Sequence, residues 1–342
     1  MGKNNFDFLR FAFALIVVFS HIIDLSLAPS LQFLKPFFDS HVSVTGFFVI
    51  SGFLITASYL RSSSISSYFE KRARRLLPAY VMVIVLSVLI FSIFTSLSFG
   101  SYFGSKQLYT YLFSNLLFVN FIQPCLPGVF LDNAYCAING ALWTIKVEVG
   151  FYLVLPLILY GLKRVPNKLM YLVGLYLLGL IYQYGLSYLM EVWPAKSNIL
   201  NTLKHQLPGY LTYFMAGIIL FQYLDYIKQK RMALGVIASI VFVVEYAAGI
   251  EVFRPLAMAV LIGCFAFGIS YLNNFGKYGD VSYGIYILHF PIIQCLVSLG
   301  FFELFNPFIL LIAIVIVVVL LGFLSWHFIE SRFIKRRSLH LG

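Results

Sequence analysis

The sequence has few charged residues and few cysteines. Only 11% of its 342 residues are Asp, Glu, Lys or Arg, whereas 61% are hydrophobic. About a quarter of the residues of a soluble domain are charged, so this composition excludes an ordinary soluble protein. Four cysteines are too few for a disulfide-rich scaffold, and their spacing matches no zinc site, so no metal site is predicted. Cys264 and Cys295 lie inside apolar runs and are interpreted as packing residues.

The first apolar run lacks the cleavage site of a signal peptide. It begins at Phe6, and Asp24 stands where small residues would be needed for cleavage, so we expect the run to remain as a membrane span. The net charge of +11 does not indicate nucleic-acid binding, because the basic residues fall in short clusters between apolar runs. Such clusters are typical of loops that set membrane topology.

Long apolar runs predict an all-α membrane protein: a polytopic bundle of about ten transmembrane helices, in one domain that covers residues 1–342. Each span needs about 20 apolar residues. The candidate spans are 8–28, 42–60, 78–98, 143–162, 168–188, 207–226, 232–249, 254–272, 281–299 and 306–328. The shorter run 108–123 is interrupted by Asn115, Asn120 and Gln123. We place it at the periplasmic face or in a re-entrant segment.

The distribution of basic residues supports ten spans with both termini in the cytoplasm. With 108–123 left out, the loops that fall on the cytoplasmic side carry 18 of the 24 basic residues, as the positive-inside rule requires. Counting 108–123 as a span would place the basic tail, with Lys335, Arg336 and Arg337, outside the cell. Cys125 and Cys136 then share the periplasmic loop 124–142, where a disulfide and two free thiols are equally compatible with the sequence.

Ionisable residues are costly inside a bilayer and indicate function by default. The first span holds four of them: Asp7, Arg10, His21 and Asp24. Arg10 and His21 are eleven residues apart, close to three helical turns, so they share a face roughly 16 Å apart along the axis. A helix interface with a few satisfied polar groups is the simpler interpretation of such a stripe. Four ionisable groups on one side favour a functional site.

Two further segments carry charge at the membrane. In KRARRLLPAY, Arg72 and Arg75 share a face of a helical turn ahead of Pro78, which suits a phosphate-bearing ligand as well as a plain topology signal. In LWTIKVEVGF, Glu148 lies about two turns into the membrane with Lys146 close by. Glu148 is compatible with a structural ion pair and, equally, with a carboxylate that orients an imidazole or acts as a base.

Two other spans have polar or small residues on one face. Tyr283, Tyr286 and His289 recur every three residues, and either packing with a buried hydrogen bond or ligand contact would explain them. In the second span, TGFFVISGFLIT contains small residues that allow a close approach of helices or would clear a narrow tunnel. These residues are Gly46, Ser51 and Gly52.

Taken in order, these motifs resemble the acyltransferase-3 family of integral-membrane acyltransferases, which O-acetylate bacterial surface glycans. The resemblance covers nearly the whole chain and rests on FLRFAFALIVVFSH, FFVISGFLIT, KRARRLLPAY, LWTIKVEVGFYLVLP, GDVSYGIYILHFPI and SWHFIES. Many relatives append a periplasmic esterase-like domain, and this chain looks like the stand-alone form.

The resemblance implies roles for individual residues. His21 matches the essential His of the family, as base or acyl carrier, with Arg10 as its partner; Glu148 matches the acidic position of the Trp-to-Glu motif. We predict that Asp24 or Glu148 orients His21. The Arg72 and Arg75 pair matches the motif that engages acyl-coenzyme A. We add Ser51 and Gly52 to this donor site, and Trp143, Tyr286 and His289 as candidate substrate-binding residues.

The predicted function is therefore O-acyl transfer, most simply O-acetyl transfer, in the bacterial inner membrane. Acetyl-CoA would be the cytoplasmic donor and no cofactor would stay bound. The acceptor would be a glycan or lipid-linked glycan on the periplasmic side, such as O-antigen, capsule or exopolysaccharide. A transporter or flippase is the alternative, because polar stripes are equally expected there. A non-catalytic scaffold would leave the stripe of the first span unexplained.

Overall fold

The structure is a computed structural model that describes residues 4–334. The predicted cytoplasmic tail with Lys335, Arg336 and Arg337 lies outside these residues. Within them the chain is helical and contains no β-strand, apart from an isolated bridge between Cys125 and Ala137. The all-α class is therefore confirmed.

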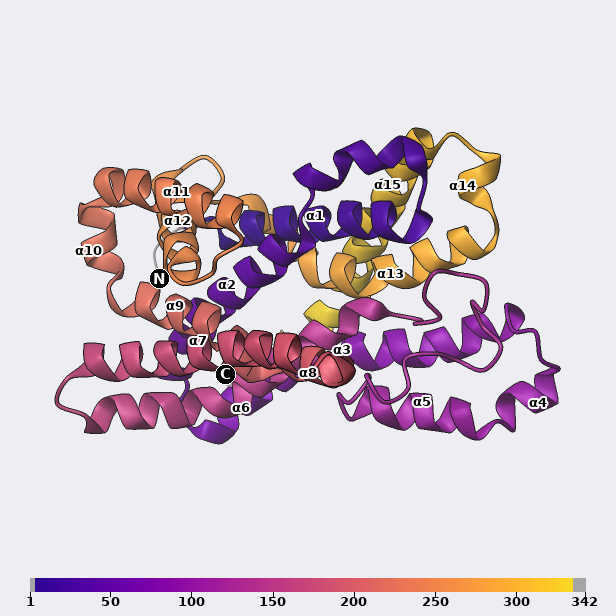
Figure 1. Ribbon diagram of the computed structural model, residues 1–342, viewed down its shortest axis with the longest axis horizontal. Coiled ribbons are helices and arrows are strands. Elements are labelled where there is room, and N and C mark those ends of the chain that lie inside the picture. The colour runs from indigo at the N-terminus through magenta and orange to yellow at the C-terminus, as the bar shows by residue number, and fades with distance from the viewer. Residues whose placement is uncertain (1–3, 335–342) are drawn as a thin grey trace, which may run out of the picture. The chain divides into compact units, whose positions relative to one another are not determined.

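The described residues contain sixteen α-helices (Figure 1). In chain order they are α1 Phe6–Ser26, α2 Ser40–Leu60, α3 Ile65–Ile90, α4 Phe99–Phe103, α5 Lys106–Leu116, α6 Trp143–Arg164, α7 Lys168–Val192, α8 Ser197–Lys204, α9 Leu211–Gln222, α10 Leu224–Gln229, α11 Arg231–Ala248, α12 Arg254–Gly268, α13 Ser282–Ser298, α14 Phe301–Leu304, α15 Pro307–Ser325 and α16 Ser331–Ile334. Short 3-10 turns occur at Pro29–Phe37, Gly140–Leu142 and Leu207–Tyr210, and a π-helical turn at Trp326–Glu330 joins α15 to α16.

Seven helical segments of the described chain are long and apolar enough to cross a membrane, judged by length and composition. Three shorter apolar helices, Leu207–Gln222, Arg254–Gly268 and Ser282–Ser298, fall on the remaining predicted spans. The polytopic helical bundle is thus confirmed, whereas the count of ten and the side of each terminus stay predictions. Helix α5 has 11 residues, about 16 Å, which is too short for a span.

The chain divides into two compact units. Unit 1 comprises the described residues up to Leu9, then Val44–Phe69 and Val147–Phe275. Unit 2 comprises Arg10–Ser43, Glu70–Lys146 and the described residues from Gly276 onward. Each unit is described here by itself.

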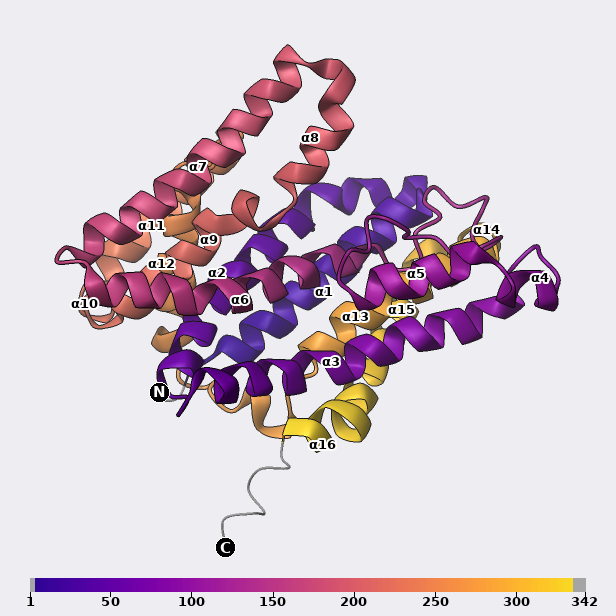
Figure 2. The same ribbon diagram turned by 90° about the horizontal axis from the view of Figure 1, so that it is seen from below.

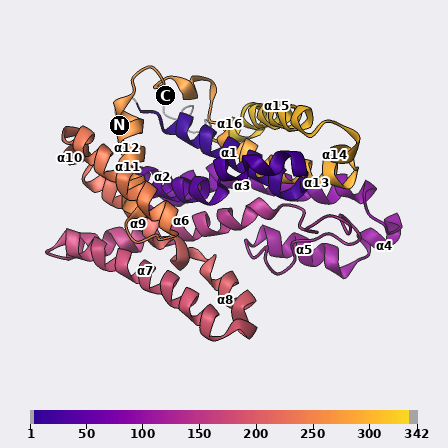
Figure 3. The same ribbon diagram turned by 45° about the horizontal axis from the view of Figure 1, so that its top comes forward.

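Unit 1 packs α2, α6, α7, α9, α11 and α12 together. Helix α7 lies against α8 and α9, and α11 pairs with α12 (Figures 2 and 3). In α2, Gly52 meets the backbone of Phe214 and Gly217 in α9, and a Cβ atom on either glycine would collide with the facing backbone. The glycine of TGFFVISGFLIT therefore serves a close helix crossing, the first of its two predicted uses.

Unit 2 is arranged around α13, which packs against α15. Gly284 of α13 faces Gly322 of α15, and a Cβ on Gly284 would lie 2.9 Å from the Gly322 Cα. Asn306 caps the N-terminus of α15, because its side chain accepts hydrogen bonds from the backbone N–H groups of Phe308 and Ile309. Pro307 occupies the first helical position, which it favours. This frame positions the residues of the candidate site.

Candidate active site

Two polar contacts join α1 to α13 within unit 2. Arg10 of α1 pairs with Asp280, which immediately precedes α13, and His21 contacts His289 within α13. Both contacts advance in the same direction along the two helices, so these helices run parallel. Because successive spans alternate in direction, two parallel spans must have an odd number of spans between them in the sequence. The ten-span prediction places seven between them, and counting 108–123 as a span would make the number even.

His21 and His289 form a close imidazole pair. The His21 Nδ1 lies 2.7 Å from the His289 Nε2, and the rings stack at 11° with centroids 5.0 Å apart. The His289 Nδ1 lies 3.2 Å from the carbonyl oxygen of Ile285, one turn earlier in α13. His289 is fully buried whereas His21 is half-buried, so His21 is the more exposed of the two rings. The arrangement provides a half-buried imidazole supported from behind by a second one.

The loop before α6 holds α13 on the side of this pair. The Asn139 side chain donates to the carbonyl of Ile287 at 2.8 Å, and Thr144 shares a 2.8 Å hydrogen bond with the Tyr286 hydroxyl. Gly140 lies against the ring of Phe290, whose edge-to-face contact with His21 has a centroid distance of 5.2 Å. For Tyr286 the structure thus shows packing with a buried hydrogen bond, one of the two predicted alternatives.

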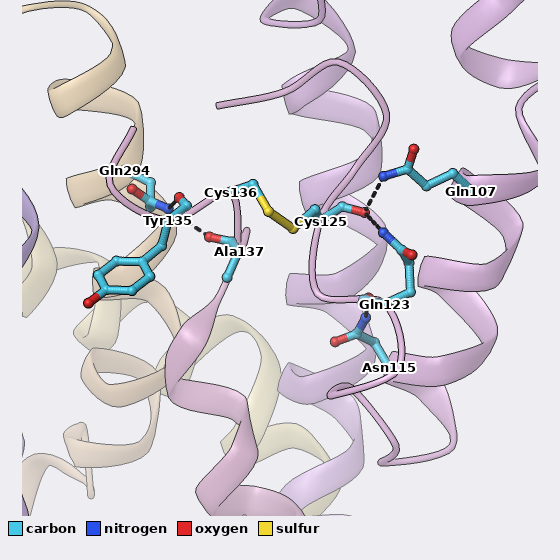
Figure 4. The surroundings of a disulfide bond; sticks show 8 residues. All are labelled: Gln107, Asn115, Gln123, Cys125, Tyr135, Cys136, Ala137 and Gln294. Carbon is cyan, nitrogen blue, oxygen red and sulfur yellow. Dashed lines mark hydrogen bonds between the residues drawn. A yellow bond between two sulfur atoms is a disulfide. The ribbon is translucent and has the colours of Figure 1, made fainter. Parts of the chain in front are cut away.

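A disulfide between Cys125 and Cys136 closes the same loop (Figure 4). Within it, the Gln294 amide of α13 donates to the carbonyls of Tyr135 at 2.6 Å and Ala137 at 2.8 Å. The structure therefore favours the disulfide over two free thiols. The segment before α6 thus contacts α13 on both sides of His289 in the sequence, at Ile287 and at Gln294.

A cluster of two arginines and two carboxylates lies at the Arg10 end of the stripe. Asp280 pairs with Arg10 and, at 2.5 Å, with Arg75 of α3. Arg75 also reaches Glu330 at 3.2 Å, and the Glu330 carboxylate is fully buried and accepts from Ser325 at 3.0 Å. The formal charges of the cluster cancel. We refer to Arg10, Arg75, Asp280 and Glu330 as the ion-pair cluster.

The arginines determine the ionisation of Asp280. Burial alone would raise the pKa of this carboxyl, but Arg10 and Arg75, together with hydrogen bonds from Ser282, hold its pKa below the ordinary value. Asp280 is therefore charged at neutral pH and forms an ion pair with each guanidinium group.

Other predicted site residues lie elsewhere. In unit 1, Glu148 of α6 accepts a 2.5 Å hydrogen bond from Tyr152 and a 3.5 Å contact from Ser51. Two residues with different predicted roles, Ser51 and Glu148, are thus brought together, whereas His21 belongs to unit 2. Asp24 pairs with Lys35 at 2.8 Å, and the residue that contacts the His21 ring nitrogen is His289.

The predicted donor-site arginines have different surroundings. Arg72 is half-buried on α3, one turn before Arg75. Arg75 is held by two carboxylates and lies 5.3 Å from the Trp326 ring. A phosphate at Arg75 would meet Asp280 and Glu330 as well. Trp143 begins α6 in unit 2 and is half-buried.

A family model described as an acyltransferase domain matches residues 3–327. The chain belongs to the acyltransferase-3 family. It is therefore a multi-pass membrane acyltransferase, as the motifs predict. No solved structure gives a significant match.

Named relatives of this acyltransferase share about a quarter of its residues. The O-acetyl transferase of Shigella phage Sf6 is 25% identical over 99% of this chain and 98% of its own length. Nodulation protein 10 of Rhizobium leguminosarum bv. viciae is 28% identical over 98% of this chain and 94% of its own. The peptidoglycan O-acetyltransferase of Listeria monocytogenes is 26% identical, and the matched region spans 84% of this chain but 49% of that protein.

Sequence reasoning missed two members of the ion-pair cluster in this acyltransferase. Asp280 and Glu330 stand inside the motifs GDVSYGIYILHFPI and SWHFIES. Asp280 is a single acidic residue just before the apolar run 281–299, and Glu330 is one just after the run 306–328. Glu330 also lies close in the sequence to the basic C-terminal residues. Pairing such acids with the arginines of the first and third spans would have found the cluster.

Proposed function

We propose that the protein transfers an acetyl group from acetyl-CoA to a hydroxyl of a cell-surface polysaccharide in the bacterial inner membrane. The observation that supports this most directly is the His21–His289 pair, a half-buried imidazole backed by a buried one on an apolar helix. Imidazole is the commonest general base, and an alcohol needs one to attack a thioester at neutral pH. Relatives named as O-acetyl transferase and peptidoglycan O-acetyltransferase support acetyl as the transferred group.

In the proposed reaction His21 removes the proton of the acceptor hydroxyl. The hydroxyl oxygen forms a bond to the thioester carbonyl carbon, the carbon–sulfur bond breaks, and the proton passes from His21 to the departing thiolate. The products are the acetyl ester and free coenzyme A. In the alternative route the His21 nitrogen attacks the thioester carbon, and the carbon–sulfur bond breaks to give acetyl-His21 and the thiolate. The hydroxyl oxygen then attacks the acetyl carbon, the carbon–nitrogen bond breaks, and the hydroxyl proton is left for the thiolate.

The donor would approach from the cytoplasmic side, where we place Arg72 as the phosphate ligand. Arginine suits phosphate because its guanidinium group makes paired hydrogen bonds. We assign Arg75 to the ion-pair cluster, since its guanidinium group already meets two carboxylates. Arg75 would then affect donor binding only indirectly. Its ion pairs would fix the position of α3, the helix that also carries Arg72.

The acceptor would approach from the periplasmic side. Disulfides persist in oxidising compartments, so the cross-linked loop Cys125–Cys136 supports an extracytoplasmic position for the end of α13 that it grips. His21, eleven residues along α1 from Arg10, would lie toward that side.

A deletion strain tests this function. The strain is complemented with wild type, His21→Ala or the control His327→Ala, whose ring is exposed. Acetate released from purified surface glycan by mild alkali is measured by mass spectrometry, and membrane abundance by an epitope tag. We expect acetate with wild type and His327→Ala and only background with His21→Ala at equal abundance. Acetate at the wild-type level in the His21→Ala strain would refute the assignment.

A further inference from the structure

The hydrogen bonds of the two rings permit one arrangement of protons when both are neutral. A backbone carbonyl only accepts, so the His289 Nδ1 that faces the Ile285 oxygen at 3.2 Å must carry a proton. In a neutral ring the His289 Nε2 then has none and acts as an acceptor. The His21 Nδ1, 2.7 Å away, must therefore be the donor. This leaves the His21 Nε2 as an unprotonated nitrogen with a free lone pair.

We infer that His289 is a positioning residue that fixes the tautomer of His21, so that its Nε2 is the base or nucleophile of acyl transfer. The inference rests on the proposed function of His21 and adds the nitrogen that acts and the group that selects it. It replaces the substrate-binding role predicted for His289. His289 has no exposed surface and lies directly against the His21 ring, which suits it to hold that ring.

Burial keeps His289 in the neutral form that this role requires. The ring has no solvent-exposed surface, and the aromatic rings of Tyr286 and Phe290 lie 5.9 and 6.4 Å from it. An imidazolium without a paired carboxylate is costly in such surroundings. The partners that the structure gives this ring are backbone groups of Ile285 and Tyr286 and the His21 ring, none of which carries a negative charge.

The frame around His289 restrains its ring. The helix hydrogen bonds of α13 place Ile285 one turn before His289, so the carbonyl that orients the ring belongs to the same rigid helix. Asn139 holds the backbone at Ile287, and Gln294 holds the next turn to the loop. A catalytic group needs such restraint because small misalignments of the reacting atoms slow the reaction strongly.

His289 also assists when His21 gains the hydroxyl proton. His21 becomes an imidazolium, and its Nδ1–H then donates a charge-assisted hydrogen bond to the His289 Nε2. The positive charge is stabilised without a carboxylate, and the proton on the Nε2 stays available for the thiolate. No further reactant is needed, because the hydroxyl supplies the proton that the thiol finally carries.

Two substitutions separate positioning from packing. In His289→Gln the amide oxygen stands near the place of the Nε2 and still accepts from His21, whereas His289→Leu offers no acceptor. Inside-out membrane vesicles from the deletion strain receive [14C]acetyl-CoA, and radioactivity in the glycan fraction gives kcat and KM. We expect His289→Leu to lose on the order of 10- to 100-fold in kcat with little change in KM, by analogy with other residues that orient a reactive ligand. His289→Gln should stay within about tenfold of wild type.

His327→Leu is the matched control. His327 makes the same kind of bond, from its Nδ1 to the carbonyl one turn earlier at 2.9 Å, but its side chain is exposed. It should retain wild-type kcat. The inference is overturned if His289→Leu keeps wild-type kcat, or if His289→Gln is as impaired as His289→Leu while both reach the membrane in normal amounts.

A measurement on the wild-type protein reports the tautomer of His21 directly. The chain has six histidines, and selective 15N labelling gives their ring signals, with His21 assigned by its loss in His21→Ala. We expect a protonated Nδ1 and an unprotonated Nε2 for His21, and the opposite pattern would refute the inference. Failure of the proposed function has a different appearance: His21→Ala itself would retain full acetylation.

Discussion

Replacing Asp280 by Asn should destabilise the protein strongly, because its carboxylate is shared by two arginines. Asp280 is 12% exposed and pairs with Arg10 and Arg75, which are themselves 21% and 17% exposed. After the change, Glu330 remains as a carboxylate partner of Arg75. Removing one partner of a buried ion pair costs about 3–5 kcal/mol, mainly because the remaining charge is left uncompensated. Asn keeps the shape of Asp, so the loss reports charge rather than a cavity.

This loss is large enough to measure by thermal unfolding in detergent. At roughly 2 °C per kcal/mol for a large chain, Asp280→Asn should lower the apparent Tm by about 6–10 °C. The matched control is Glu70→Gln, which breaks the exposed Glu70–Arg74 pair, where both side chains are 36% exposed. That change should cost no more than about 0.5 kcal/mol, or about 1 °C. Equal Tm values for the two variants would refute the account of the ion-pair cluster.

The pH dependence of this difference follows from the pKa of Asp280. Since the folded protein holds this pKa below its ordinary value, the stabilisation is present above the unfolded pKa of about 3.9 and is lost as the pH falls through the folded value. The Tm gap between wild type and Asp280→Asn should therefore persist from about pH 8 to about pH 5. A gap that closes within this range would indicate that Asp280 is not held in its charged form.

Three further substitutions test the frame around the site. A Cβ at Gly140 would lie 2.6 Å from the Phe290 ring, which contacts the His21 ring. Gly140→Ala should therefore displace Phe290 and lower the acetylation rate, with about 1–3 kcal/mol lost in thermal unfolding. An unchanged rate would show that Phe290 moves freely. Replacing Cys125 and Cys136 together by Ser opens a short loop, which costs about 3 kcal/mol in the chain-entropy model. The double variant should have a lower apparent Tm and a lower acetylation rate. Wild-type values for both would mean that the loop holds α13 without its cross-link. Gly284→Ala should separate α13 from α15 and reduce detergent stability, whereas an unchanged Tm would show that the crossing relaxes.

Much of the fold could be predicted from the sequence because lipid imposes a simple rule. Apolar runs of about 20 residues locate the spans, and polar interruptions such as Asn115 correctly set 108–123 apart, where α5 proves too short to cross. The ionisable residues of the first span were also recognisable, since charge inside an apolar run is rare. The helical class and the acyltransferase family are confirmed.

The pairing of residues distant in the sequence could not be predicted in the same way. Helical spacing places Arg10 and His21 on one face but does not say which helix covers that face. His289 is more than 260 residues from His21, and their contact depends on how α13 packs beside α1. The depth of Glu148 suggested either a structural ion pair or a carboxylate that orients His21 or acts as a base; in the structure it contacts Tyr152 and Ser51. The depth of a residue in the membrane does not determine which side chains surround it.

The transfer of label from [14C]acetyl-CoA to surface glycan tests the central claim most directly. Inside-out vesicles that contain equal amounts of wild type or His21→Gln are supplied with the labelled donor, and the radioactivity released from the glycan fraction as acetate is counted. Loss of a general base typically costs about 10²–10⁴-fold in rate. The account predicts labelled acetate with wild type and background with His21→Gln. Equal labelling by the two proteins would contradict it.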